Sequence, residues 1–437
     1  MVVGACLLQE MAFAVEPPDH KAQMSWLDNG VIRLGIDLEL GGAITWLSKS
    51  GEAPNIVNSY DWGRQIQMSF YSGPIPFAVG DRHPTKVWQG LGWNPIQSGD
   101  YAGHRSHVLE QQNDGHRIHV KCVPMQWPLD SVPGDCTVES WLELDGGAVR
   151  ARCRLLNART DRVQYPARDQ EMPAVYTNAP WHRIFTYSGA RPFTGEPIEQ
   201  IAAHGPPEWT RWTATENWSA LLDESGWGLG VVNSLTTKFV GGFSGKPGSG
   251  GATDAPCGYL SPTRPEILDW NIDFSYEYEL VLGTADEIRA RSQRSTGGRK
   301  NLGWDFQNSR LGWHYLNASD EGWPVRDGLD IAWKQPDPQL ESPPFFCRAE
   351  DAGMLLIDAA ITSGDTRGQV YWATTAAGEF DAERLLTFPI LGDGARRTYR
   401  VSLSSAPGYR GGITRLRIDP SESAPGKIQL HSVRLEK

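Results

Sequence analysis

Apolar and polar residues alternate along many short segments of this chain, and the alternation predicts β-strands. In residues 148–156, arginines alternate with smaller or apolar residues. A period of two gives a strand one wet face and one buried face. This segment and residues 137–144 flank Asp145-Gly146-Gly147, which predicts a hairpin. Further strands are predicted at 31–38 and 43–47, on either side of Gly41-Gly42, and at 117–123, 218–222, 228–233, 238–243 and 274–282.

One segment has the pattern of a helix. Thr284 and Glu287 form a capping box, and good helix formers continue to Arg294. Gly297-Gly298 then breaks the pattern, so we expect a domain boundary between about 293 and 302. A second unit of strands follows at the spacing typical of a sandwich: 353–361, 369–374, 398–404, 413–418 and 427–435.

Length and charge exclude several classes of protein. A chain of 437 residues is long enough for two buried cores. Its net charge of −11, without any block of Lys or Arg, disfavours a nucleic-acid partner. The sequence contains no run of 18 apolar residues, so it predicts no membrane-spanning helix.

The first residues are typical of an export signal. Residues 2–14 are mostly small or apolar, and Ala12-Phe13-Ala14 fits a cleavage site, although Glu10 interrupts the apolar stretch. We therefore expect residues 1–20 to be a leader or the remnant of a signal peptide, and the protein to be secreted or periplasmic. A frayed leader without a targeting role is the alternative.

Tryptophan is abundant, with 18 residues spread along the chain. Indole offers a large, rigid apolar face that matches the C–H faces of sugar rings. Most single tryptophans in a protein are core residues. As a set, in an acidic and strand-rich chain, they favour a carbohydrate-handling protein.

The layout of the chain resembles a known architecture. The opening strand–Gly41-Gly42–strand and the long run of antiparallel strands look like the galactose mutarotase-like β-supersandwich of aldose epimerases, polysaccharide lyases and glycoside hydrolases. The tail from Gly412 to Pro420, with its closing strand, resembles the jelly-roll modules attached to polysaccharide-degrading enzymes. The resemblance implies an all-β fold, with an antiparallel supersandwich as catalytic domain at 21–296 and a smaller jelly-roll, carbohydrate-binding-like domain at 297–437.

Residues 61–71 are the first candidate for chemistry. Alternation places Gln65, Gln67, Ser69 and Tyr71 on one face of a strand, where amides and hydroxyls suit the hydroxyl groups of a sugar. An ordinary solvated sheet face is the alternative.

Residues 92–107 are the second candidate. They lack strand periodicity and combine aromatic, amide, carboxylate and imidazole groups, as binding loops do.

Two further segments carry candidate carboxylates. Asp169 and Glu171 are two residues apart, on one face if the chain is extended. Glu216 is flanked by tryptophans, which would desolvate it and suit a general acid. Since glycoside hydrolysis needs one protonated and one ionised carboxylate, Glu171 and Glu216 are the predicted pair. The predicted catalytic residues are Glu171, Glu216, Asp169, Asp61 and His104.

The function expected from the sequence is a secreted glycoside hydrolase that acts on a polysaccharide or oligosaccharide. The alternatives are a polysaccharide lyase or sugar epimerase, which would use His104 or His107 with Tyr71, Tyr101 or Tyr176, and a non-catalytic glycan-binding protein. The predicted substrate-binding residues are Trp62, Arg64, Gln65, Gln67, Tyr71, Trp93, Asn94, Gln97, Asp100, His107, Trp181, Trp212 and Trp218.

No cofactor is expected from the sequence. His104 and His107 are three residues apart but lack further ligands at the spacing of a zinc site. A structural calcium ion could use carboxylates of the C-terminal unit, because oxygen ligands suit that ion. The tryptophans of this unit are expected to bind glycan or to pack against the larger domain; they are Trp304, Trp313, Trp323, Trp333 and Trp372, and the carboxylates are Asp305, Asp327, Asp330 and Asp419.

Overall fold

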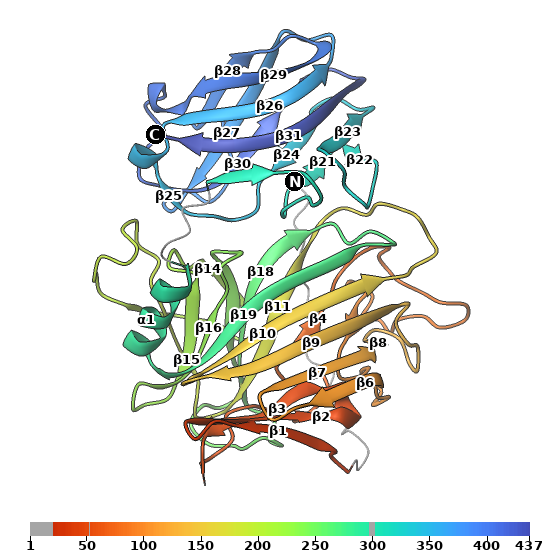
Figure 1. Cartoon of the computed structure of the whole chain (residues 1–437), viewed down its shortest axis with the longest axis vertical. Coiled ribbons are helices and arrows are strands. Elements are labelled where there is room, and N and C mark those ends of the chain that lie inside the picture. The colour runs from red at the N-terminus through yellow and green to blue at the C-terminus, as the bar shows by residue number, and fades with distance from the viewer. Residues whose placement is uncertain (1–20, 52, 297–301) are drawn as a thin grey trace.

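The computed structural model describes residues 21–51, 53–296 and 302–437, and almost all regular elements in this part of the chain are antiparallel β-strands. Figure 1 shows two units stacked along the long axis of the molecule. The predicted all-β fold class is confirmed. The expected leader at 1–20 lies outside the described residues, and so do Gly297-Gly298, on which the predicted boundary rests.

Three sheets build the N-terminal unit. A three-stranded sheet contains β1 (Met24–Asp28), β2 (Ile32–Asp37) and β3 (Ala43–Lys49). A nine-stranded sheet has the order β13 (Glu199–Ile201), β12 (Arg183–Thr186), β15 (Trp218–Leu222), β16 (Trp227–Val232), β19 (Asp273–Thr284), β10 (Ala148–Asn157), β9 (Cys136–Asp145), β7 (Arg117–Val123) and β6 (His107–Asn113). A seven-stranded sheet has the order β14 (Thr210–Thr213), β17 (Lys238–Ser244), β18 (Cys257–Glu266), β11 (Arg168–Asn178), β4 (Gln67–Ser69), β5 (Pro95–Ile96) and β8 (Met125–Gln126).

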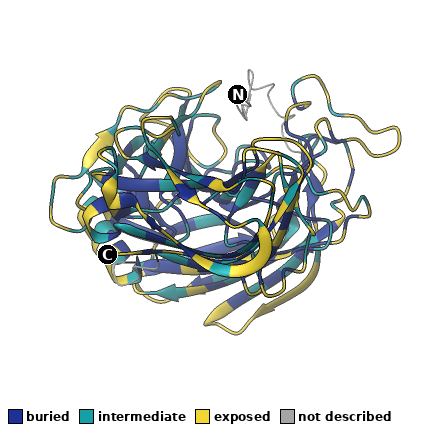
Figure 2. Cartoon of the chain, turned by 90° about the horizontal axis from the view of Figure 1, so that it is seen from above, coloured by how far each residue is buried: buried dark blue, intermediate teal, exposed yellow. Residues whose placement is uncertain are grey.

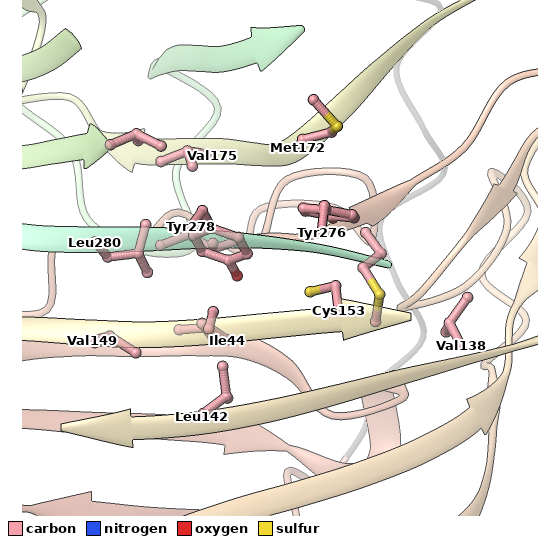
Figure 3. Packing of buried hydrophobic residues seen from close by; sticks show 14 of the residues in the cluster. Ile44, Val138, Leu142, Val149, Cys153, Met172, Val175, Tyr276, Tyr278 and Leu280 are labelled. Atoms are coloured by element: carbon pink, nitrogen blue, oxygen red, sulfur yellow. The ribbon is translucent and has the colours of Figure 1, made fainter. Parts of the chain in front are cut away.

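The apolar faces of these sheets meet in one core. Figure 3 shows Met172 and Val175 of β11 facing Tyr276 and Tyr278 of β19 across the space between the two large sheets. This is the packing that the alternation predicts, because every second residue of each strand points inward. Buried residues fill the interior, whereas exposed residues lie along loops and outer edges (Figure 2). The outer faces are therefore left for polar side chains.

The helix α1 (Ala285–Thr296) begins as the sequence predicts. The backbone N–H of Thr284 donates to Glu287 Oε2 at 2.8 Å, and the backbone N–H of Glu287 donates to Thr284 Oγ1 at 3.4 Å. This reciprocal pair is a capping box. The helix packs against β15, β16 and β19, so it covers part of the outer face of the nine-stranded sheet.

The C-terminal unit is a sandwich of two six-stranded sheets. One has the order β22 (Ser319–Asp320), β23 (Leu329–Trp333), β31 (Gly426–Glu436), β26 (Met354–Thr362) and β29 (Asp393–Ser402), with β20 (Gly303–Asp305) also paired to β31. The other has the order β21 (His314–Leu316), β24 (Gln339–Glu341), β30 (Gly412–Asp419), β27 (Arg367–Thr374) and β28 (Leu385–Pro389), with β25 (Cys347–Arg348) also paired to β30.

The two units meet through side chains. Within the described residues no strand pairing crosses between them. Arg310 of the C-terminal unit is 4% exposed and forms ion pairs with Asp269 of the N-terminal unit and with Asp320, the latter at 2.5 Å. Trp323 packs against the cores of both units. These contacts fix a polar and aromatic interface beside the seven-stranded sheet.

Candidate active site

A glutamate on the outer face of the seven-stranded sheet is the centre of the candidate site. Glu171 lies on β11, between β4 and β18, while its neighbour Met172 points into the core. The half-buried Glu171 carboxylate accepts a hydrogen bond from the Tyr71 hydroxyl at 2.8 Å and another from the Tyr259 hydroxyl. The pairing register shifts just after Glu171, and such irregularities re-aim side chains next to functional sites.

Aromatic rings surround this carboxylate. Tyr176 and Trp209 both pack on Tyr259, with ring centroids 4.9 Å and 4.8 Å away. Burial raises the pKa of Tyr259 well above its ordinary value, and the nearby charge of Glu171 adds to the effect. The Tyr259 phenol therefore keeps its proton and stays a hydrogen-bond donor to Glu171.

Asp169 lies two residues before Glu171 and bonds to side chains on the same outer face. Its carboxylate contacts Lys238 Nζ at 2.8 Å and Arg211 Nη1 at 3.1 Å, and its side chain is 26% exposed. Burial raises the pKa of Asp169, but the Lys238 and Arg211 charges outweigh burial and hold that pKa below its ordinary value. Because Asp169 and Glu171 are two residues apart on the extended strand β11, their side chains lie on the same face of the sheet.

Glu216 is not part of this site, so the predicted pair of Glu171 and Glu216 needs correction. Glu216 is fully buried and accepts hydrogen bonds from Arg289 Nη2 at 2.6 Å, Trp218 Nε1 at 3.0 Å and the Phe193 backbone N–H at 2.6 Å. Arg289 belongs to α1, which packs on the other large sheet. Glu216 is buried as the sequence predicts, but Trp218 donates a hydrogen bond to it, and Arg289, which is distant in sequence, pairs with its charge.

Asp61 and Arg64 form an ion pair, with Asp61 Oδ2 3.0 Å from Arg64 Nε. Both residues are buried, and Arg64 also donates to the carbonyl of Ala255. Burial raises the pKa of Asp61 although the Arg64 charge opposes it. The Arg64 guanidinium also lies over the Tyr60 ring, 5.0 Å from its centroid, so the pair is held by several contacts inside the protein.

The polar face of residues 64–71 is buried at Gln65 and Gln67, so the predicted substrate-binding role of these two residues was wrong. Gln65 and Gln67 are 0% and 2% exposed. Gln65 Nε2 donates to the carbonyl of Asp61 at 2.8 Å, and Gln67 Nε2 donates to the carbonyl of Trp62 at 3.1 Å. The side chains thus stabilise a buried loop. Tyr71, at the end of this segment, is the member that reaches Glu171.

The candidate binding loop 92–107 is mostly a buried scaffold. Its first residues hydrogen-bond inside the protein: Trp93 Nε1 donates to Asp135 Oδ1 at 2.8 Å, Asn94 Nδ2 to the carbonyl of Phe70 at 2.8 Å, and Gln97 Nε2 to the carbonyl of Gly41 at 3.1 Å. The exposed residue His107 opens the edge strand β6. The predicted substrate-binding role of Trp93, Asn94 and Gln97 is therefore corrected to a structural one.

His104 is partly exposed and lies beside two aspartates. Its Nδ1 is 3.0 Å from Asp100 Oδ2 and 3.4 Å from Asp130 Oδ1. Among the described residues, these three are the one group of possible ligands whose atoms lie within 4.8 Å of one another. The carboxylate of Asp100 already accepts three backbone N–H groups, from Ala102, His104 and Ser131, so the cluster closes a turn. Asp305, Asp327, Asp330 and Asp419, considered for calcium, form no such group in the described part of the chain.

Most candidate tryptophans are core residues. Trp62, Trp181 and Trp218 are 2%, 5% and 0% exposed, and Trp212 packs against the core. In the C-terminal unit, Trp304, Trp313, Trp333 and Trp372 belong to its own core, while Trp323 joins the two units. The predicted sugar-binding roles of Trp62, Trp181 and Trp218 are therefore corrected to structural ones, whereas that of the partly buried Trp212 stays a prediction. Trp323 packs against the larger domain, which is one of the two roles expected of the C-terminal tryptophans. Trp209, which the sequence did not single out by itself, is the tryptophan that packs beside the site.

Two open pockets lie away from Glu171. One, of about 330 Å³, is lined by His182, Arg183, Gln200, Glu224 and Phe243 among others. The second, of about 270 Å³, lies beside Trp141, which His119 and Arg152 cover at 4.9 Å and 5.1 Å. Both neighbours lie against the Trp141 ring, so a sugar would have to compete with them for its faces.

Comparison with known proteins gives fold neighbours only. No protein-family model matches the sequence, and no curated protein matches it. Similar solved structures include a galactose mutarotase-like protein from Lactobacillus casei, with 12% identity, a TM-score of 0.40, and 60% of this chain and 100% of that chain covered. A galactose mutarotase related enzyme from Lactobacillus acidophilus has 10% identity and a TM-score of 0.38, with 60% and 97% covered. A 4-α-glucanotransferase from Thermococcus litoralis has 13% identity and a TM-score of 0.32, with 60% and 40% covered.

None of the helices in the described part of the chain is both long and apolar enough to cross a membrane. Among the solved structures similar to this chain are galactose mutarotase-like proteins, whose architecture its layout resembles.

Proposed function

We propose that this protein is a carbohydrate-active enzyme in which Glu171 is the base and Tyr71 the acid of a proton transfer on a sugar, as in an epimerase. The observation that carries the proposal is the Glu171 carboxylate on an outer sheet face, bonded to the hydroxyls of Tyr71 and Tyr259. A carboxylate with phenol donors on both oxygens suits the ionised form, which has only acceptor sites.

The surroundings favour a sugar as the substrate. Tyr176 and Trp209 each pack on Tyr259, which bonds to Glu171, and aromatic rings of this kind match the apolar faces of sugars. Hydroxyl and carboxylate groups next to them can bond to sugar hydroxyls. Glu171 would accept the proton of a sugar hydroxyl, while Tyr71, which is half-buried, would donate one to the ring oxygen.

Charge distribution argues for a tyrosine acid. Asp169 is held ionised by Lys238 and Arg211, so it is a poor proton donor. Arg64 is paired with the buried Asp61, which argues against the role of neutralising a uronate that lyase chemistry would require of it. A tyrosine hydroxyl can donate a proton without help from Asp169 or Arg64.

A glycoside hydrolase is the second candidate. The observation that favours it is the position of Asp169 and Glu171, two residues apart with hydrogen-bond partners on the same face of the sheet. In that case Glu171 would act on the glycosidic bond and Asp169 would serve as the second carboxylate.

The test is to incubate the protein with freshly dissolved α-D-glucose and α-D-galactose, and in parallel with a polysaccharide panel. We expect optical rotation to relax faster than in buffer, with no new reducing ends. Reducing ends without absorbance at 235 nm would support the hydrolase instead, and both signals together would support a lyase. The absence of all three signals would contradict the proposal and favour a glycan-binding protein.

A further inference from the structure

Two buried hydroxyls flank Glu171 in the sheet. Ser69 of β4 and Thr263 of β18 are the residues directly opposite Glu171 on its two neighbouring strands. Directly opposite residues of an antiparallel pair have Cβ atoms about 4.5–5.5 Å apart and point to the same face. The three side chains therefore form one row across three strands.

Neither hydroxyl has a hydrogen-bond partner within the described residues. Ser69 is 1% exposed and Thr263 is 2% exposed, and their oxygens are enclosed. Buried hydroxyls are normally bonded, because an enclosed and unpaired one destabilises the folded state. Two unpaired hydroxyls, one on either side of a carboxylate, destabilise the fold locally, and proteins retain such features mainly at functional sites.

The hydrogen bonds of Glu171 to the two tyrosines explain why Ser69 and Thr263 stay unpaired. Both carboxylate oxygens are taken by the hydroxyls of Tyr71 and Tyr259. For Glu171 to accept a proton from a sugar, a sugar hydroxyl has to displace one of these tyrosines. The carboxylate then loses a donor at the moment when its orientation matters most.

We propose that Ser69 and Thr263 are positioning residues, which donate hydrogen bonds to Glu171 when a substrate displaces its tyrosine partners. Opposite Cβ atoms are about 5 Å apart, so a change of the Glu171 rotamer toward a neighbouring strand would bring its carboxylate to either hydroxyl. Glu171 thus has an outer arrangement, with the tyrosines, and an inner one, with the hydroxyls. This inference rests on Glu171 being the reacting carboxylate of the proposed function.

The experiment removes a tyrosine partner of Glu171 by mutation, so that no substrate is needed to displace it. Tyr259→Phe removes one outer donor, and Thr263→Val removes one inner donor while keeping the shape of the side chain. In the wild-type background we expect Thr263→Val to leave the thermal midpoint unchanged or to raise it. In the Tyr259→Phe background the same change should lower the midpoint by about 2 °C, because Glu171 has turned to Thr263. Tyr71→Phe with Ser69→Ala is the second pair, should Tyr259→Phe fail to fold.

A matched control lies two residues away. Ser261 is also fully buried on β18, but its hydroxyl already donates to the carbonyl of Pro262 at 3.1 Å. Ser261→Ala should therefore change the midpoint equally in both backgrounds. An equal effect of Thr263→Val in the two backgrounds, or none in either, would overturn the inference whether or not the protein turns over a sugar.

Turnover gives the second readout. Hydrogen bonds to the charged form of a carboxylate lower its pKa. Since the inner hydrogen bond forms only in the substrate complex, the acidic limb of the kcat profile should move up by about half a pH unit to one unit in Thr263→Val, while KM at neutral pH stays the same. An unshifted profile with lower kcat at all pH values would contradict the positioning role.

Discussion

The buried ion pair of Glu216 and Arg289 allows a direct test of the corrected site. Glu216 is fully enclosed, and Arg289 contacts its Oε1 through Nη2 at 2.6 Å and Nε at 3.2 Å. Glu216→Gln keeps the size of the side chain but removes its charge. The Arg289 guanidinium, whose side chain is 14% exposed, would then lack its counter-ion.

The expected loss is one of stability. Breaking a buried pair by changing one partner destabilises a protein by about 3–5 kcal/mol, because the remaining charge is uncompensated. The amide nitrogen of Gln also cannot accept the hydrogen bond that Trp218 Nε1 donates at 3.0 Å. For a unit of this size the thermal midpoint should fall by roughly 6–10 °C. Turnover per folded molecule should stay near that of the wild type.

The assay combines urea unfolding with turnover measured well below the unfolding midpoint. Arg289→Met is the partner variant, and the double variant should lose clearly less stability than the sum of the two single losses. A stable Glu216→Gln variant whose turnover falls about 10²-fold would refute this reasoning and would restore Glu216 as a catalytic residue.

Three further results are expected. Asp169→Asn should lower the free energy of unfolding at pH 7 by about 1 kcal/mol, and the loss should fade below about pH 3.9, because a depressed pKa contributes stability that is lost as the carboxylate protonates; equal losses at pH 7 and pH 3 would contradict it. Burial raises the pKa of Asp419 to about 6, so the wild type should gain stability relative to Asp419→Asn as the pH falls from 7 to 4, as urea unfolding would measure. Gly41→Ala should lower stability by about 2 kcal/mol or more, because Gly41 has φ +63° and an added Cβ would collide with the carbonyl of Gln97; an unchanged midpoint would show that the turn is different.

Much of the fold could be predicted from the sequence because its strands are locally patterned. The hairpin of β9 and β10, the capped start of α1 and the five predicted C-terminal strands all follow from alternation and turn residues. These signals lie within a few residues of one another. Tertiary context therefore did not override them.

The strands of the candidate site carry a weaker signal. β11 contains Pro173, and β18 contains Pro262 and Pro265. Proline cannot donate to a ladder, so its presence argues against an internal strand. β18 was missed for this reason, and Tyr259 was missed with it.

The partners of each candidate carboxylate could not be predicted either. Tyr71 and Tyr259 are 100 and 88 residues from Glu171 in sequence. Arg289, which neutralises Glu216, is 73 residues from it. The tryptophans beside Glu216 predict burial correctly, but a sequence pattern does not tell a desolvated acid from a buried ion pair.

The central claim is that Glu171 is the reacting carboxylate, and the turnover of Glu171→Gln tests it most directly. Glu277→Gln is the matched control, since Glu277 is exposed on the nine-stranded sheet. With both variants folded, Glu171→Gln should lower the rate of anomer interconversion by at least ~10²-fold, as expected when a general base is lost, while Glu277→Gln keeps the wild-type rate. A folded Glu171→Gln variant with the wild-type rate would contradict the claim.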